Sequence, residues 1–150
     1  MYFFKEINEI DYSVIYQVQE IETEAFGEGA MNEWFLVPFI RYGKVYVLMN
    51  SDGEVVASAE YMRDFTNPQM AYLFALSVKQ PLRGQGLGTK LMQKSLAKLK
   101  EEGIELVKLT VGPENGRALR LYRKLGFIQA EFCPNEYGQG EDRLVLQKQL

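Results

Sequence analysis

The stretch MAYLFALSVKQPLRGQGLGT occupies residues 70–89 of a 150-residue chain and contains the features that decide the fold. Its first nine residues are almost continuously apolar, which is typical of a central strand buried on both faces. Its last seven residues form a glycine-rich turn, and helical spacing follows from there to about Glu102. A buried strand that leads through a turn into a helix favours an α/β or α+β architecture.

The segments on either side of this stretch complete the pattern. Asp11 is expected to cap a first helix, and Pro38 should kink a second one or end it early. The turn Asn50-Ser51-Asp52-Gly53 predicts a hairpin. We expect one domain over residues 1–150. Besides the strand and helix already named, helices are expected at 12–26, 32–42 and 114–125, and strands at 2–7, 44–49, 54–62, 104–111, 127–133 and 143–149.

Composition excludes several classes of protein. The chain is 47% hydrophobic and 25% charged, which is too apolar for intrinsic disorder. Its longest run without charge, 65–78, has 14 residues and contains Pro68, so we expect no membrane span. The first residues lack the pattern of a signal peptide, and a single cysteine favours a reducing compartment, so we expect a cytoplasmic protein.

The chain has no histidine, which removes the catalytic triads, the Cys-His pairs and the histidine metal sites. We therefore expect no metal, and acid–base chemistry carried by Glu, Asp, Tyr, Lys or water. The net charge of −3 divides unevenly, because residues 1–60 carry −8 and residues 61–150 carry +5. Such a division arises by chance in many sequences, or it indicates that the halves face ligands of opposite sign. Nucleic acid is not an expected partner, because the pI is about 5.1.

The glycine-rich turn predicts a seat for a phosphate or pyrophosphate. Glycines leave the backbone N–H groups accessible, and the start of a helix adds the positive end of its dipole. Neither the Walker A spacing nor the dinucleotide fingerprint is present, because Thr89 stands where the fingerprint needs its third glycine. The residues of this expected seat are Arg83, Gly84, Gln85, Gly86, Leu87, Gly88 and Thr89.

A second motif lies downstream. Asn115, Ala118 and Tyr122 have the spacing of one helix face, and the small Ala118 leaves room for a ligand between the other two. Tyr122 alone would pass for a half-buried aromatic residue. Together the spacing Arg-x-x-Gly-x-Gly at 83–88 and Asn-x-x-Ala-x-x-x-Tyr-x-x-x-Gly-Phe at 115–127 resembles the GNAT superfamily of N-acetyltransferases.

The resemblance implies a fold, a co-substrate and a set of roles. The fold would be a mixed, mostly antiparallel sheet of six or seven strands flanked by about four helices. Acetyl-CoA would lie with its pyrophosphate on the turn 83–89 and its arm along Leu76, Ser77 and Val78, near Asn115 and Ala118. Tyr122 would protonate the leaving thiolate, and a primary amine would attack directly.

For the general base and the acceptor the pattern leaves more than one candidate. The ribosomal-protein N-terminal acetyltransferases carry Leu-Glu-Val where this chain has Leu109-Thr110-Val111, so that glutamate is absent. Glu60 is the first candidate for the base, although a solvent-facing strand residue would look the same. A small cationic amine is the expected acceptor, and the alternative acceptor is a protein or peptide amine. Two other readings are transfer of a longer acyl group and a CoA-binding domain without catalysis. Other residues expected near the acceptor are Glu22, Glu24, Glu28, Glu136 and Tyr137.

The chain is expected to be a monomer or a homodimer. Its apolar residues Trp34, Phe35 and Phe39 could belong to the core or to a dimer contact.

Overall fold

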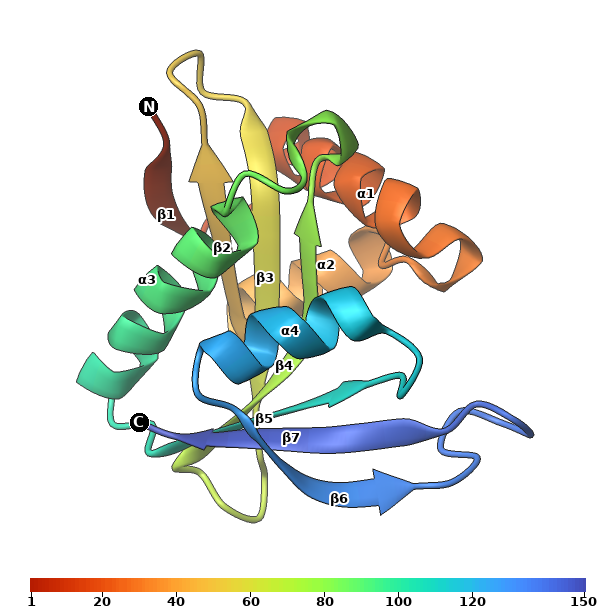
Figure 1. The fold of residues 1–150 in the computed structure, drawn as a ribbon. Coiled ribbons are helices and arrows are strands. Elements are labelled where there is room, and N and C mark those ends of the chain that lie inside the picture. The colour runs from red at the N-terminus through yellow and green to blue at the C-terminus, as the bar shows by residue number, and fades with distance from the viewer.

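A computed structural model describes all 150 residues as a twisted seven-stranded sheet with helices on both faces (Figure 1). Every expected strand and helix is present, within a few residues of its expected bounds. Two 3₁₀ turns, η1 Gly27–Gly29 and η2 Gln80–Leu82, are additional. The strands are β1 Phe3–Ile7, β2 Lys44–Met49, β3 Val55–Arg63, β4 Met70–Val78, β5 Leu106–Val111, β6 Ile128–Cys133 and β7 Arg143–Gln149; the helices are α1 Tyr12–Phe26, α2 Glu33–Tyr42, α3 Leu87–Glu101 and α4 Gly116–Lys124.

The sheet order is β1-β2-β3-β4-β5-β7-β6. All neighbouring strands are antiparallel except β4 and β5, which are parallel and are connected through α3. This mixed, mostly antiparallel sheet with four flanking helices confirms the expected fold class.

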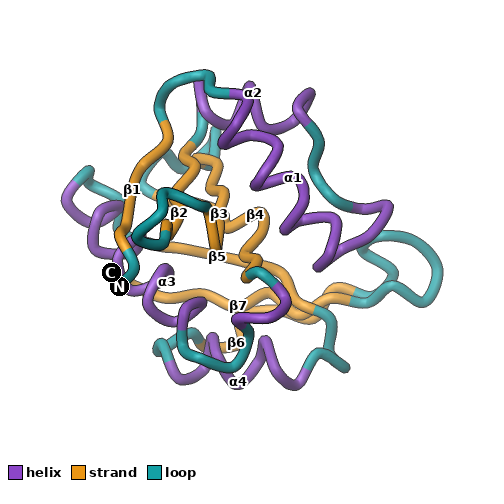
Figure 2. Tube along the Cα trace, turned by 90° about the horizontal axis from the view of Figure 1, so that it is seen from above, coloured by secondary structure: helices purple, strands orange, loops and turns teal.

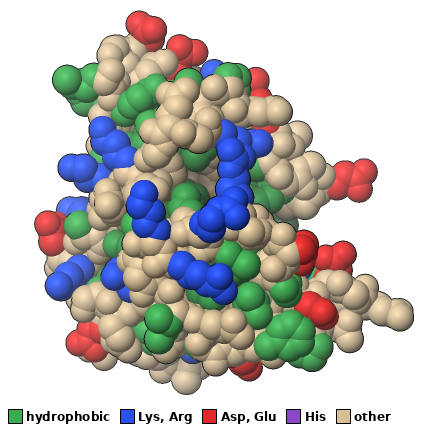
Figure 3. All heavy atoms as spheres, viewed as in Figure 1, with side chains coloured by type: hydrophobic (Ala, Val, Ile, Leu, Met, Phe, Trp, Pro, Cys, Tyr) green, Lys and Arg blue, Asp and Glu red, His purple; other side chains and the backbone are tan.

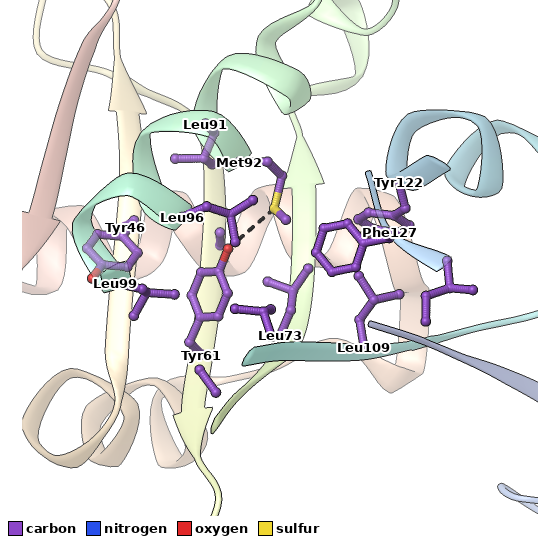
Figure 4. Packing of buried hydrophobic residues seen from close by; sticks show 14 of the residues in the cluster. Tyr46, Tyr61, Leu73, Leu91, Met92, Leu96, Leu99, Leu109, Tyr122 and Phe127 are labelled. Carbon is purple, nitrogen blue, oxygen red and sulfur yellow. Dashed lines mark hydrogen bonds between the residues drawn. The ribbon is translucent and has the colours of Figure 1, made fainter. Parts of the chain in front are cut away.

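The helices divide between the two faces of the sheet (Figure 2). α1 and α2 pack on β2, β3 and β4, over an aliphatic cluster that includes Ile15, Val18 and Leu36. α3 and α4 cover the opposite face and share a larger cluster with β2 to β5 and β7, in which Tyr61 and Leu109 are fully buried (Figure 4). The Tyr61 hydroxyl is satisfied there by Ser95 Oγ at 2.7 Å and by the Met92 sulfur at 3.4 Å.

The predicted cap at Asp11 is confirmed, and Asn32, expected as the first residue of the second helix, is its N-cap. The Asp11 side chain accepts a hydrogen bond from the Ser13 N–H at 2.9 Å, and Asn32 does the same for α2. The helix does not end early at Pro38, which was one of the two outcomes expected there. α2 continues through Pro38 to Tyr42, with the Gly43 N–H still bonded to the Phe39 carbonyl.

The two central strands separate half-way along their length. β4 and β5 pair only from Met70–Leu106 to Leu73–Leu109, and from Phe74 onward β4 has no partner on that side. The separation coincides with a bulge, because Glu60 of β3 pairs with Ala75 while Tyr61 pairs with Leu73. Phe74 is therefore the extra residue of β4. The sheet opens from this point, and the opening faces the glycine-rich turn.

Candidate active site

A cavity of about 420 Å³ lies where β4 and β5 separate. One wall is the unpaired end of β4, and a second is the turn between η2 and α3. A third is α4, and the end of α1 closes the cavity from the other side of the sheet. The cavity thus collects segments from residue 25 to residue 122, and more than half of its lining residues are hydrophobic.

The glycine-rich turn has the backbone that the sequence predicts. Gly84 and Gly86 have φ angles of +81° and +80°, values that glycine adopts without strain. Gly86 is the N-cap of α3, and no side chain caps the helix, so its first N–H groups remain available to an anion. Gly88 allows close helix packing, because a Cβ atom there would lie 3.2 Å from the Leu121 Cδ1 atom. The Arg83 Nε–H donates to the Val78 carbonyl at 3.1 Å and ties the turn to the end of β4.

α4 brings Asn115, Ala118 and Tyr122 to one side of the cavity, as their spacing predicts. The Asn115 side-chain oxygen Oδ1 caps the helix by accepting from the Ala118 N–H at 3.2 Å, which leaves the side-chain NH₂ group for another partner. Tyr122 is 8% exposed and packs edge-on against Phe127. Burial, with a smaller contribution from Tyr72, raises the pKa of the Tyr122 hydroxyl, so it is protonated at neutral pH and can donate a proton.

Most of the expected cofactor residues line this one cavity. Gln85 does not, and neither does Glu60, the expected base. Arg117 also lines the cavity; the sequence places it among the basic residues that flank Asn115 and Tyr122, of which one or two are expected to meet a phosphate of the cofactor. Sequence reasoning did not assign four other lining residues to this site. Leu121 follows Ala118 by three residues, so helical spacing could have indicated it, whereas the two residues from α1 reach the cavity only through the tertiary fold. These four are Ala25, Phe26, Leu82 and Leu121.

Positive charge gathers at the mouth of the cavity. Arg83 and Arg117 line it, and Figure 3 shows Lys and Arg side chains clustered across the middle of this face, around a hollow with hydrophobic walls. An elongated ligand with an anionic end and an apolar arm matches this combination of free N–H groups, arginines and hydrophobic walls.

Glu60 occupies a different environment from the one expected of a base. Its side chain is 0% exposed and faces α1, because β3 directs Ser58 and Glu60 toward α1 and α2, and Ala57, Ala59 and Tyr61 toward α3. It lies next to Glu22 of α1, which is 1% exposed. Burial, and in second place the charge of Glu22, raise the pKa of Glu60 well above its usual range.

Tyr72, which sequence reasoning did not assign to the site, is close enough to Tyr122 to shift its pKa. The Tyr72 hydroxyl of β4 is 2.9 Å from Thr110 Oγ1 of β5, one residue beyond the last β4–β5 pair, Leu73–Leu109. Burial raises the pKa of Tyr72 to about 12, and Tyr137 and Glu136 of the β6–β7 loop contribute to the shift. The position where a glutamate is absent thus holds a threonine bonded to a tyrosine.

Residues 7–127 match the family model described as the acetyltransferase (GNAT) family. The chain belongs to this family. An N-alpha-acetyltransferase of Sulfolobus acidocaldarius is 28% identical over 144 residues, covering 89% of this chain and 86% of the relative. Ard1 from Thermoplasma volcanium has the same fold, with a TM-score of 0.85, 21% identity and coverage of 99% and 97% of the two chains. A Bacillus subtilis acetyltransferase in complex with CoA has the same fold, with a TM-score of 0.78 and 17% identity. The match covers 100% of this chain and 99% of the other.

The protein is therefore an N-acetyltransferase of the GNAT family with acetyl-CoA as donor. The cavity suits this donor on its own evidence: uncapped N–H groups and arginines lie at one end, and apolar side chains of β4 and α4 lie at the other. None of the helices is long and apolar enough to cross a membrane.

Proposed function

We propose that this protein, acting as a single domain over residues 1–150, transfers an acetyl group from acetyl-CoA to the α-amine of a polypeptide. The observation that carries the proposal is the cavity at the separation of β4 and β5, with the anion seat of α3 at one end and Tyr122 beside it. The turn residues 83–89 would hold the pyrophosphate. The backbone edge of Leu76 to Val78, which has no partner strand on the β5 side, and the Asn115 side-chain amide would hold the arm.

The chemical step needs two proton movements. The neutral amine attacks the thioester carbonyl carbon directly, the carbon–sulfur bond breaks, and the amine nitrogen gives up its proton to a solvent water molecule, since no carboxylate lines the cavity. Tyr122 supplies a proton to the departing sulfur, because a phenol hydroxyl is protonated at neutral pH and Tyr122 lines the cavity. No covalent enzyme intermediate is required when both substrates are held together.

The nature of the lining residues bears on the acceptor. No residue that lines the cavity is a carboxylate, and Tyr72 and Tyr122 both have pKa values too high for a base at neutral pH. An acceptor that is already neutral therefore has an advantage. At pH 7.5 about one third of an α-amine with a pKa of about 7.8 is neutral, against about 0.1% of an amine with a pKa of about 10.4. This difference supports an α-amine over a lysine side chain or a polyamine.

The similarity to an N-alpha-acetyltransferase over 89% of the chain supports the same acceptor class. A small cationic amine is the second candidate, as the sequence predicts. It is favoured by the charge of −8 on residues 1–60, because α1, whose end lines the cavity, belongs to that half.

Release of free thiol from acetyl-CoA tests both candidates. Purified protein is assayed at pH 7.5 with peptides of varied first residue, with the same peptides blocked by N-terminal acetylation, and with spermidine. We expect thiol release with at least one free peptide, none with its blocked form, and a lower kcat/KM for spermidine. Faster thiol release with spermidine than with any peptide would favour the second candidate, a small cationic amine, over the α-amine of a polypeptide. No release with any acceptor, while acetyl-CoA binds, would refute it.

A further inference from the structure

Two carboxyl groups that the proposed reaction does not use are buried together under α1. Glu22 comes from the third turn of α1 and Glu60 from β3, and their side chains are 1% and 0% exposed. Both oxygens of Glu60 and one oxygen of Glu22 have no hydrogen-bond donor from the rest of the protein. Buried polar atoms without a partner are rare in folded proteins, so this arrangement needs an explanation.

The surroundings contain no counter-charge. In the sheet, Glu60 lies between Val45 of β2 and Ala75 of β4, and the next pair along holds Ser58 between Val47 and Ser77. The Ser58 and Ser77 hydroxyls bond to each other at 3.1 Å. No Lys or Arg shifts the pKa of either carboxyl. Each carboxyl acts on the other, the charge of Glu60 also acts on the neighbouring Tyr61, and Ser58 lowers the pKa of Glu60 by less than burial and Glu22 raise it. The hydrophobic cluster on this side of the sheet draws on α1, α2, β2 and the connection between the helices, and it includes Val18, Ile21, Met31, Leu36, Ile40, Val45 and Val47.

Two adjacent carboxylates without a cation cannot both stay ionised in such an environment. One proton between them removes a charge and also supplies the missing donor, because the protonated carboxyl donates to the ionised one. The pKa directions agree: burial raises the pKa of both groups, and the charge of Glu22 raises that of Glu60 further.

The pair joins the segments that build the cavity. Glu22 lies one turn before Ala25 and Phe26, which line the cavity. Its carboxyl is also close enough to the Met31 backbone and the Ser77 side chain for both to lower its pKa. Ser77 belongs to the unpaired end of β4 and lines the cavity too. One carboxyl pair thus touches the end of α1, the connection to α2, and β4.

We propose that Glu22 and Glu60 share a single proton, and that this bond holds the end of α1 and the α1–α2 connection against β4, which positions the Ala25–Phe26 wall of the cavity. They are positioning residues, because neither lines the cavity. When both carboxyls ionise at high pH, their repulsion separates α1 from the sheet and loosens this wall. The consequence for acetyl transfer rests on the proposed function; the consequence for the structure does not.

Hydrogen–deuterium exchange of residues 24–32, read by mass spectrometry and corrected for intrinsic rates, tests the proposal between pH 6 and pH 9. The variants are Glu60→Gln and Glu22→Gln, since an amide N–H on either side replaces the shared proton at every pH. Glu20→Gln, exposed on the same helix, removes one charge as a matched control. In the wild type and the control, protection of this segment should fall by up to about tenfold per pH unit once the pair ionises. In either Gln variant that remains folded, it should stay constant.

An equal loss of protection in the Gln variants and the wild type would overturn the proposal, and so would constant protection in all four proteins. CoA binding by titration calorimetry runs in parallel. If CoA binds to none of the proteins, the proposed function fails while the exchange data still decide on the pair. If CoA binds with an affinity that weakens at high pH only in the wild type and the control, the pair positions the cavity wall as proposed.

Discussion

Replacement of Glu60 by Gln should change how the stability of the protein depends on pH. A carboxyl whose pKa is raised in the folded state contributes stability that is greatest below its unfolded pKa and is lost as the pH rises through the folded value. Burial without a cation places Glu60 in this class. The free energy of unfolding falls by up to about 1.4 kcal/mol per pH unit over the pH range in which the folded pair still holds a proton that the unfolded chain has released.

For a chain of this length, that slope corresponds to a fall of about 3–6 °C in Tm per pH unit. Glu60→Gln has no such proton to lose and should lack this part of the slope. Urea unfolding followed by circular dichroism at pH 5.5, 6.5 and 7.5 measures it, with Glu20→Gln as the control for loss of one charge. We expect the stability of Glu60→Gln, relative to the wild type, to increase steadily with pH. Parallel curves for the wild type and Glu60→Gln would refute the reasoning.

Three further predictions concern the cavity. Tyr122→Phe should lower kcat by about 100-fold or more in steady-state kinetics, because the general acid is lost, while the Kd for acetyl-CoA measured by calorimetry should change by less than about twofold. Arg117→Gln should weaken CoA binding by about tenfold, and more at low salt, whereas Arg120→Gln, outside the cavity, should not. Gly86→Ala should cost about 1–2 kcal/mol in urea unfolding because φ is +80° there, and should weaken CoA binding; Gly53→Ala, at φ +79° in a distant turn, should cost the same without affecting CoA.

The part of the site that is local in sequence could be predicted from it. The spacing of residues 83–89 defines a turn that needs glycine at positive φ, and helical periodicity places Asn115, Ala118 and Tyr122 on one face. These inferences need only the geometry of one turn and one helix. Capping at Asp11 is local in the same sense and was predicted from the sequence.

Contacts between distant segments were not accessible in this way. Glu22 and Glu60 belong to different elements, and no pattern in either segment indicates that the two carboxyls meet. Glu60 in particular has the alternation of a half-exposed strand, which predicts solvent rather than complete burial under α1. Ala25 and Phe26 reach the cavity for the same reason: the packing of α1 on β3 and β4 places them there.

The bulge at Phe74 shows how one residue decides both the cavity and the environment of the carboxyl pair. Without an extra residue, alternation from Leu73 would direct Ala75 and Ser77 toward α3. With it, Leu76 takes that side, next to the cavity, while Ala75 and Ser77 turn toward α1 and the carboxyl pair. The pairing of β4 with β5 also ends at Leu73, so the same bulge coincides with the opening of the sheet. In a run as uniformly apolar as residues 70–78, alternation carries no signal of such a shift. Deletion of Phe74 should therefore do more than shorten a strand: it should reverse the faces of the end of β4, bury Leu76 against the carboxyl pair and abolish CoA binding.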